Sequence, residues 1–402
     1  MIAALTVSVT MSVTMSAAWA ADVVVTADTL WTGVGPPIAD GVVVVRGATI
    51  AAVGPASTVA VPAGATVVHA VAVTPGFVDG LSVAGLTGPL NKPFDQDHRQ
   101  PGDPVVPELR AIDAYAPWDE LVGWLRQHGV TTVNTGPSPG APVGGTTLIA
   151  STIAGPGYVV AADGMVVVTL GESSKDWPGA QTRMGDVAEV RQAFAAAREY
   201  RDRRKLPLAD RAEVDLGAEA LVAALDRKRR VVIVAHRSDD LLAALRLRDE
   251  FGLDVILAGA TEGYLVRDAL AAAKVPVLVG PVMARQWSSP GESHDGTFEN
   301  AHLLDAVGVP IGLMSGYEDY VPKVRVIPFE AAIAAANGLG EDRAIAVATF
   351  GTASILGIAD RKGSLAVGKD ADLVLFDGDP LEVVTHTCKV MIAGVFVEDT
   401  CR

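Results

Sequence analysis

The middle of the chain, residues 74–362, alternates short continuous apolar runs with longer segments in which apolar residues recur every three or four positions. Runs rich in Val, Ile and Leu are typical of strands buried on both faces, and the periodic segments predict amphipathic helices. Eight such runs follow one another: VTPGFVDGLSV, GVTTVNTG, TTLIAST, MVVVTLG, VVIVAHR, DVILAGA, VPVLVG and VPIGLMSG. This alternation predicts an α/β fold with a parallel sheet covered by helices, and eight strands fit a closed (β/α)8 TIM barrel.

The two flanks of this region have a different pattern, in which short β runs are separated by Gly, Pro and Ala turns. Residues 22–73 contain VVVTADTLWTG, GVVVVRGATIAAVG and ATVVHAVA, and residues 363–402 contain SLAVGKDADLVLFDGDP and CKVMIAGVFVED. Because both ends share this pattern, we expect them to form one small β domain, a β-sandwich, beside the barrel of residues 74–362.

Residues 1–21 predict a signal peptide that is not part of the fold. Their apolar stretch ends in Ala18, Trp19 and Ala20, a small-x-small cleavage site before Ala21. The basic region that usually begins such peptides is missing, and a buried first strand is the alternative. No other stretch is long and apolar enough to span a membrane. We therefore expect export, to a periplasm, with no membrane span after cleavage.

Charge and cysteine content exclude some function classes. The net charge of −15 over 402 residues argues against binding to nucleic acid or to anionic membrane surfaces. The two cysteines, Cys388 and Cys401, flank a predicted hairpin turn at Ala393 and Gly394, nearly opposite each other. In an oxidising compartment they could form a disulfide worth about 2–3 kcal/mol, and two free thiols are the alternative. Neither state implies thiol catalysis.

The carboxyl ends of the predicted strands are where a barrel of this kind carries its functional residues. Polar side chains follow four of these strands. They are Glu172 and Lys175 after the fourth strand, His236 after the fifth, Glu262 after the sixth, and Tyr317 and Asp319 after the eighth. The candidate site is therefore expected among these residues.

Eight motifs follow one another in the chain. They are PGFVDG at 75–80, DPVVPELRAID at 103–113, HGVTTVNTGP at 128–137, GESSK at 171–175, AHRSDD at 235–240, TEGY at 261–264, VGP at 279–281 and GSLAVGKDADLVLFDGDPLE at 363–382. In this order they resemble the imidazolonepropionase-like branch of the amidohydrolase superfamily. The resemblance implies an amidohydrolase-type barrel that carries out hydrolysis with one or two divalent metals.

The resemblance also implies a set of metal ligands, from which this chain departs. The family pattern has an H-x-H pair on strand one, a Glu or Lys near strand four, His on strands five and six, and a proton-shuttling Asp on strand eight. Here Leu81 and Val83 stand at the H-x-H positions, Gly259 at the strand-six histidine and Gly316 at the strand-eight Asp. Leu, Val and Gly side chains offer no lone pair, and a bound cation needs three or more N or O ligands. We therefore expect no cofactor, and Zn as the divalent metal if one binds.

Glu172, Lys175 and His236 remain of the usual set. Glu172 and His236 are candidate metal ligands. The alternative for Glu172 is an ion pair with Lys175, and the alternative for His236 is that of a relic polar residue. A desolvated Lys175 is a candidate base or nucleophile, and Asp319 is a candidate for the missing Asp unless it lies in a solvated loop. The emptied cavity predicts substrate contacts from Leu81, Val83, Gly259, Glu262 and Tyr317, with anchoring of the strand-six loop as the alternative for Glu262.

Three functions fit these observations. The first is a non-catalytic amidohydrolase homologue that acts as the partner of a catalytic paralogue or as a homo-oligomer. The second is a hydrolase of carbon–nitrogen bonds with a reduced mononuclear site, and the third is a periplasmic small-molecule binder that uses the emptied cavity. Because four ligand positions at three strand ends are vacant while the strands and flanking motifs are intact, we favour the first.

Overall fold

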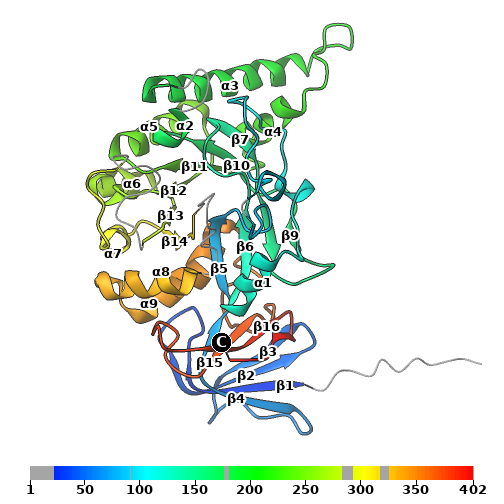
Figure 1. Ribbon diagram of the computed structural model, residues 1–402, viewed down its shortest axis with the longest axis vertical. Helices are drawn as coiled ribbons and strands as arrows, with labels where there is room; N and C mark the ends of the chain where they lie inside the picture. The colour runs from blue at the N-terminus through cyan, green and yellow to red at the C-terminus, as the bar shows by residue number, and fades with distance from the viewer. Residues whose placement is uncertain (1–21, 91, 176–180, 283–292, 317–325, 402) are drawn as a thin grey trace, which may run out of the picture.

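The computed structural model describes residues 22–90, 92–175, 181–282, 293–316 and 326–401. It has a mixed α/β fold, as the sequence predicts, with a sheet made by the two ends of the chain beside a larger α/β part (Figure 1). The predicted signal peptide, residues 1–21, lies outside the described residues. No helix in the described part of the chain has the length and apolar character needed to cross a membrane.

The two ends of the chain form one seven-stranded sheet in the order β17-β16-β15-β4-β1-β2-β3. Its strands are β1 (Val23–Leu30), β2 (Ile38–Arg46), β3 (Thr49–Pro55), β4 (Thr66–Pro75), β15 (Leu373–Phe376), β16 (Thr387–Ile392) and β17 (Val395–Glu398). The antiparallel pairing of β4 with β15 joins the two flanks, with Pro75 opposite Leu373. The prediction that both termini build one β unit is therefore confirmed. A two-layer β-sandwich is not shown, because the described strands of the flanks form a single continuous sheet.

The predicted hairpin at the C-terminus is confirmed. Ala393 and Gly394 connect β16 to β17 with φ angles of 48° and 78°, as a two-residue turn that matches the strand twist requires. A side chain at Gly394 would lie 1.9 Å from the carbonyl oxygen of Gly47, so only glycine fits there. Cys388 and Cys401 are joined by a disulfide, which is the first of the two states expected for them.

All eight predicted apolar strands are present in the α/β part. A four-stranded sheet, β5-β6-β8-β9, contains β5 (Phe77–Ser82), β6 (Val130–Thr135), β8 (Leu148–Ser151) and β9 (Val159–Ala161). A six-stranded sheet, β14-β13-β12-β11-β10-β7, contains β7 (Val143–Thr146), β10 (Val166–Thr169), β11 (Val231–Ala235), β12 (Val255–Gly259), β13 (Val277–Val279) and β14 (Ile311–Leu313). Strands β10 to β14 are parallel to one another, as are β5 and β6.

The prediction of a wholly parallel sheet is wrong at the third predicted strand. That strand, β8, pairs antiparallel with β6, and β7 pairs antiparallel with β10. Residues 136–142 between β6 and β7 contain no helix. A short connection brings the chain back beside its neighbour in the opposite direction, whereas a parallel neighbour needs a longer crossover.

Hydrogen bonds connect the two sheets of the α/β part. At the carboxyl ends of β5 and β14, the Gly316 N–H donates to the Leu81 carbonyl at 3.3 Å and the Ser315 N–H donates to Asp79 Oδ1 at 3.0 Å. Between β7 and β8, the Thr147 N–H donates to the Met165 carbonyl at 2.9 Å. The sheets are therefore neighbours on both sides, although no closed eight-stranded barrel is detected among the described strands.

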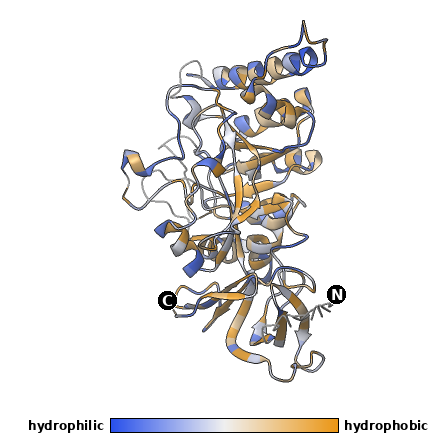
Figure 2. Cartoon of the chain, turned by 90° about the vertical axis from the view of Figure 1, so that its right-hand side faces the viewer, coloured by the Kyte–Doolittle hydropathy of each residue, from blue (hydrophilic) through white to orange (hydrophobic). Residues whose placement is uncertain are grey.

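The helices lie on the outside of the α/β part, as Figure 1 shows. They are α1 (Glu120–Gln127), α2 (Glu172–Lys175), α3 (Arg183–Arg203), α4 (Leu216–Leu225), α5 (Ser238–Phe251), α6 (Arg267–Ala273), α7 (Asn300–Asp305), α8 (Ile327–Ala334), α9 (Glu341–Ala346) and α10 (Thr352–Leu356). In Figure 2 the strands between them are mostly hydrophobic, whereas hydrophilic and hydrophobic bands alternate along the helices.

The continuous apolar runs of the sequence are explained by two separate apolar clusters. In β11, Val231 and Ile233 belong to a large cluster that includes helix residues, and Val232 and Val234 belong to an inner cluster. Successive side chains of a strand point to opposite faces, so a strand covered on both faces needs apolar residues at every position. The inner cluster also contains Leu81 and residues of β10, β12 and β13.

Candidate functional site

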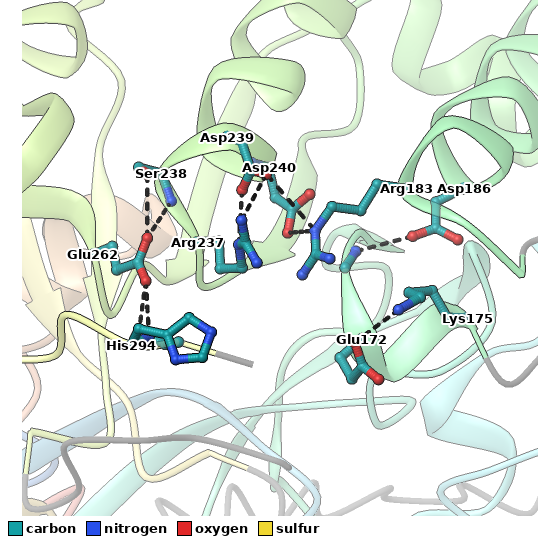
Figure 3. Close-up of polar contacts among 12 residues, drawn as sticks. Glu172, Lys175, Arg183, Asp186, Arg237, Ser238, Asp239, Asp240, Glu262 and His294 are labelled. Carbon is teal, nitrogen blue, oxygen red and sulfur yellow. Dashed lines mark hydrogen bonds and ion pairs between the residues drawn. The ribbon is translucent and has the colours of Figure 1, made fainter. Parts of the chain in front are cut away.

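The candidate site lies where the carboxyl ends of β10, β11 and β12 meet. Figure 3 shows the charged side chains that follow these strands, and their contacts with the first turns of α3 and α5. They are Glu172, Lys175, Arg183, Asp186, Arg237, Asp239, Asp240 and Glu262. Parallel strands bring residues that are far apart in the chain to this one edge.

His236 follows β11 directly and is 2% exposed. Its Nδ1 lies 2.9 Å from the hydroxyl oxygen of Thr261. Burial lowers the pKa of His236 to about 3, although the nearby Glu262 carboxylate acts to raise it. The imidazole is therefore neutral at physiological pH.

Gly259, the position of the strand-six histidine in the family pattern, lies against the His236 ring. A Cβ atom at Gly259 would lie 2.4 Å from His236 Cε1, and the φ angle of Gly259 is +85°. Both the backbone conformation and the packed imidazole therefore favour glycine. The space expected to be vacant at this position is filled by the imidazole.

Leu81 and Val83 are completely buried, with 0% exposure, in the inner apolar cluster. The same cluster contains Val78, Ile256, Leu278 and Met314. Without solvent-accessible surface they cannot contact a ligand in this conformation. Their role as substrate contacts stays a prediction, and in the structure they are part of the core.

Asp79 is a buried carboxylate to which the sequence analysis assigned no role. It is 0% exposed, and it accepts hydrogen bonds from the Ser315 hydroxyl at 2.5 Å and the Ser315 N–H at 3.0 Å. Burial raises its pKa to about 7, although these hydrogen bonds and one from the Leu81 N–H act to lower it. Its place in the PGFVDG motif was the only signal in the sequence. The motif gives no indication of its contact with Ser315, which follows β14.

Glu262 anchors the loop after β12. Its carboxylate accepts hydrogen bonds from the Ser238 N–H at 2.9 Å, the Ser293 hydroxyl at 3.1 Å and the His294 N–H at 3.2 Å. Burial acts to raise the pKa of Glu262, but these hydrogen bonds outweigh it and lower the pKa. The contacts correspond to the anchoring alternative and leave substrate binding by Glu262 a prediction.

Glu172 and Lys175 form the expected ion pair, with 3.0 Å between Lys175 Nζ and Glu172 Oε2. Both belong to the short helix α2, and their side chains are 39% and 28% exposed. Ion pairs with this exposure contribute little to stability. Catalysis by Lys175 and metal binding by Glu172 stay predictions.

Arg183 and Asp186, at the start of α3, are site residues that the sequence analysis missed. Arg183 Nε lies 3.0 Å from Asp240 Oδ2, and Asp186 accepts a hydrogen bond from the Gly171 N–H at 3.1 Å. Burial raises the pKa of Asp186 to about 6 and also raises that of Asp240, against the attraction of Arg183. Only the folding of α3 over the ends of β10 and β11 brings these groups together.

A metal ion finds no complete ligand set in the described part of the chain. No three His, Cys, Asp or Glu side chains there are grouped so that they could hold one. Leu81, Val83 and Gly259 supply no donor atoms, and Gly316 supplies no side chain. Tyr317 and Asp319 lie outside the described residues, so their predicted roles are not placed. The described residues therefore do not fit the metal that the resemblance implies.

Comparisons with known proteins agree on the type of fold. A model of the amidohydrolase family matches residues 293–400. Amidohydrolase tasK from Hapsidospora irregularis is 27% identical over 358 residues, which cover 80% of this chain and 36% of that protein. The chain therefore spans little more than a third of the length of this curated relative.

Two solved structures extend the comparison. An amidohydrolase from Thermotoga maritima MSB8 superposes with a TM-score of 0.87 and 29% identity, covering 94% of this chain and 100% of that one. An adenosine deaminase from Xanthomonas campestris with bound zinc has a TM-score of 0.54 and 20% identity, covering 94% and 93%. The second likeness concerns the fold alone. Together, the family match over residues 293–400 and the full-length likeness to the Thermotoga amidohydrolase support placing this chain in the amidohydrolase superfamily.

Proposed function

We propose that this protein is an imidazolonepropionase-like amidohydrolase homologue with a degenerate metal site, which acts without metal-dependent hydrolysis. It works as a folded partner, either of a catalytic amidohydrolase paralogue or of a second copy of itself. The proposal includes a closed (β/α)8 barrel. The hydrogen bonds between the ends of β5 and β14 support this closure. No cofactor is part of the proposal.

One observation carries the proposal: the family's ligand positions have become part of the protein core. Leu81 and Val83 are fully buried among apolar side chains, and the His236 ring packs on Gly259. A charged metal placed here would lack the three or more N or O ligands that it needs. Without a metal, no bound water is brought to a pKa near neutrality, so the usual nucleophile of such hydrolases is missing.

Export to a periplasm is part of the same proposal. The small-x-small site at Ala18 to Ala20 supports it, and so does the disulfide between Cys388 and Cys401, since disulfides persist in oxidising compartments. Folding and assembly with a partner would then follow signal cleavage.

Metal content and hydrolysis test the proposal together. The protein is purified after signal cleavage, and Zn, Mn, Fe, Ni and Co are measured by elemental analysis beside assays on amide and peptide substrates. We expect far less than one metal per chain and no hydrolysis that a chelator stops. Near-stoichiometric metal with chelator-sensitive hydrolysis would overturn the proposal.

A hydrolase of carbon–nitrogen bonds is the second candidate, and the full-length likeness to the Thermotoga amidohydrolase favours it. Its reduced mononuclear site would use Glu172, His236 and Asp319. It predicts metal binding that disappears in His236→Ala, whereas unchanged metal content in that variant would exclude it. The third candidate, a periplasmic small-molecule binder, requires Leu81 and Val83 to become accessible on binding.

A further inference from the structure

A cavity of about 220 Å³ lies away from the strand-end site, where the segment between β15 and β16 meets α1 and α8. Its apolar walls include Phe329 of α8, Phe376 of β15, and Leu381. Its polar lining includes His128, Glu382 and His386. In Figure 1 this is the boundary between the terminal sheet and the α/β part.

His128, the residue after α1, lines this cavity and carries a hydrogen-bond acceptor. Its Nδ1 lies 2.8 Å from the carbonyl oxygen of Trp124. A carbonyl oxygen only accepts hydrogen bonds, so Nδ1 carries the proton. In the neutral ring Nε2 is then an acceptor.

His386 has the same tautomer for a related reason. Its Nδ1 lies 2.8 Å from Asp377 Oδ2, and its backbone N–H donates to Asp377 Oδ1 at 2.7 Å. These hydrogen bonds from His386 lower the pKa of Asp377, so the carboxylate is ionised and accepts both bonds. Nε2 of the neutral His386 ring is therefore also an acceptor.

The third polar group is the exposed side chain of Glu382. Neither its carboxylate nor Nε2 of His128 or His386 has a hydrogen bond or ion pair with any residue that the structure describes. The lining of the cavity contains no lysine or arginine. Two acceptors and one negative charge are thus unopposed beside aromatic walls.

We propose that this cavity binds a protonated organic amine with an apolar body. An ammonium group has up to three N–H donors, and the lining offers it imidazole and carboxylate acceptors. The side chains of Phe329, Phe376 and Leu381 would cover the apolar body of the ligand. A metal ion fits less well, because no three His, Cys, Asp or Glu side chains of the described residues, those that line this cavity included, are grouped so that they could hold one.

Calorimetry on the full mature chain tests this inference with benzylamine as the probe and benzyl alcohol as its neutral counterpart. A buffer near pH 8 keeps the amine charged. We expect benzylamine to bind, and benzyl alcohol to bind at least about tenfold more weakly because it lacks the charge-assisted hydrogen bonds. Glu382→Gln, which preserves shape and removes only the charge, is expected to weaken benzylamine binding by about tenfold.

A matched control is His69→Gln, since His69 is an exposed histidine beside Asp28 on the terminal sheet and does not line the cavity. It should leave the affinity unchanged. In proton NMR spectra, benzylamine should shift the imidazole signals of His128 and His386 but not those of His69. Equal binding of benzyl alcohol, no heat with benzylamine, or binding of Zn²⁺ without binding of benzylamine would each overturn the proposal.

Discussion

The carboxyl ends of the strands in the α/β part fall into two groups, which differ in whether they carry charged or apolar side chains. The ends of β5 and β12 carry Leu81, Val83 and Gly259, which are buried and apolar. At β10 and β11, charged side chains remain, and they are paired, as Lys175 is with Glu172 and Arg183 with Asp240. Charge persists where a partner is present, and the rest of the edge has become core.

The difference follows from the cost of burial. An ionised group without a partner is too costly to bury, so an emptied metal site is stable only if its polar ligands are replaced or neutralised. In the proposed degenerate site, Leu81 and Val83 stand in place of polar ligands. His236 is neutral, because burial lowers its pKa to about 3. The predictions below test whether the apolar part is core and the charged part peripheral to stability.

The largest effect is expected from Leu81→Ala. Removing a fully buried side chain from the inner cluster leaves a cavity, which should lower the free energy of unfolding by about 2–5 kcal/mol. Urea denaturation measures it. Leu208→Ala is the control, because Leu208 is 84% exposed and its loss should change stability by no more than about 0.5 kcal/mol. Equal effects of the two variants would show that Leu81 faces an open cavity.

The effect of replacing the buried Asp79 on the free energy of unfolding should depend on pH. Its pKa is about 7 in the folded protein and about 3.9 in the unfolded chain, so the folded state binds more protons between these values. The contribution of Asp79 to stability is therefore complete below about pH 4 and is lost as the pH rises to about 7, by at most about 4 kcal/mol. Asp79→Asn should be more stable relative to the unchanged protein at pH 8 than at pH 4.

The contribution of His236 to the free energy of unfolding should change with pH in the opposite direction. Its folded pKa is lowered to about 3 from about 6.5, so its contribution is present above about pH 6.5 and is lost on acidification. His236→Gln should therefore lose less stability than the unchanged protein between pH 7 and pH 4. Urea denaturation between pH 4 and pH 8 measures both variants, with the exposed Asp28→Asn as the control. Differences that do not change with pH would contradict the burial of both groups.

A smaller effect is expected where the imidazole packs on β12. Gly259→Ala places a methyl group 2.4 Å from His236 Cε1 at a φ of +85°. Gly252→Ala has a φ of +69° and no atom within 4 Å of the added Cβ. The control should cost about 1 kcal/mol from backbone strain alone, and Gly259→Ala about 1–3 kcal/mol. Thermal unfolding compares them, and equal shifts would mean that the imidazole moves away freely.

The smallest effect is expected from Lys175→Met. The Glu172–Lys175 pair is partly exposed, so its loss should change the free energy of unfolding by about 0–1 kcal/mol. Salt screens exposed pairs, and a high-salt denaturation curve should reduce the difference further. A loss comparable to that of Leu81→Ala would show that the charged part of the edge is also core.

Local pattern by itself determined the elements of this protein. The eight apolar runs became strands because a strand covered on both faces needs apolar residues at every position. The turn at Ala393 and Gly394 was predictable because few residues tolerate positive φ at two successive positions. The joining of the two flanks was also predictable, since each has short strands that need neighbours.

Only the tertiary structure decided how the strand ends meet. Asp79 and Ser315 are 236 residues apart, and neither local sequence predicts the hydrogen bond between them. The contact of Arg183 with Asp240 and the packing of His236 on Gly259 likewise join separate segments of the chain. Sequence patterns report the faces that a segment must bury, whereas the burial and partner of a charged group depend on segments that only folding brings together.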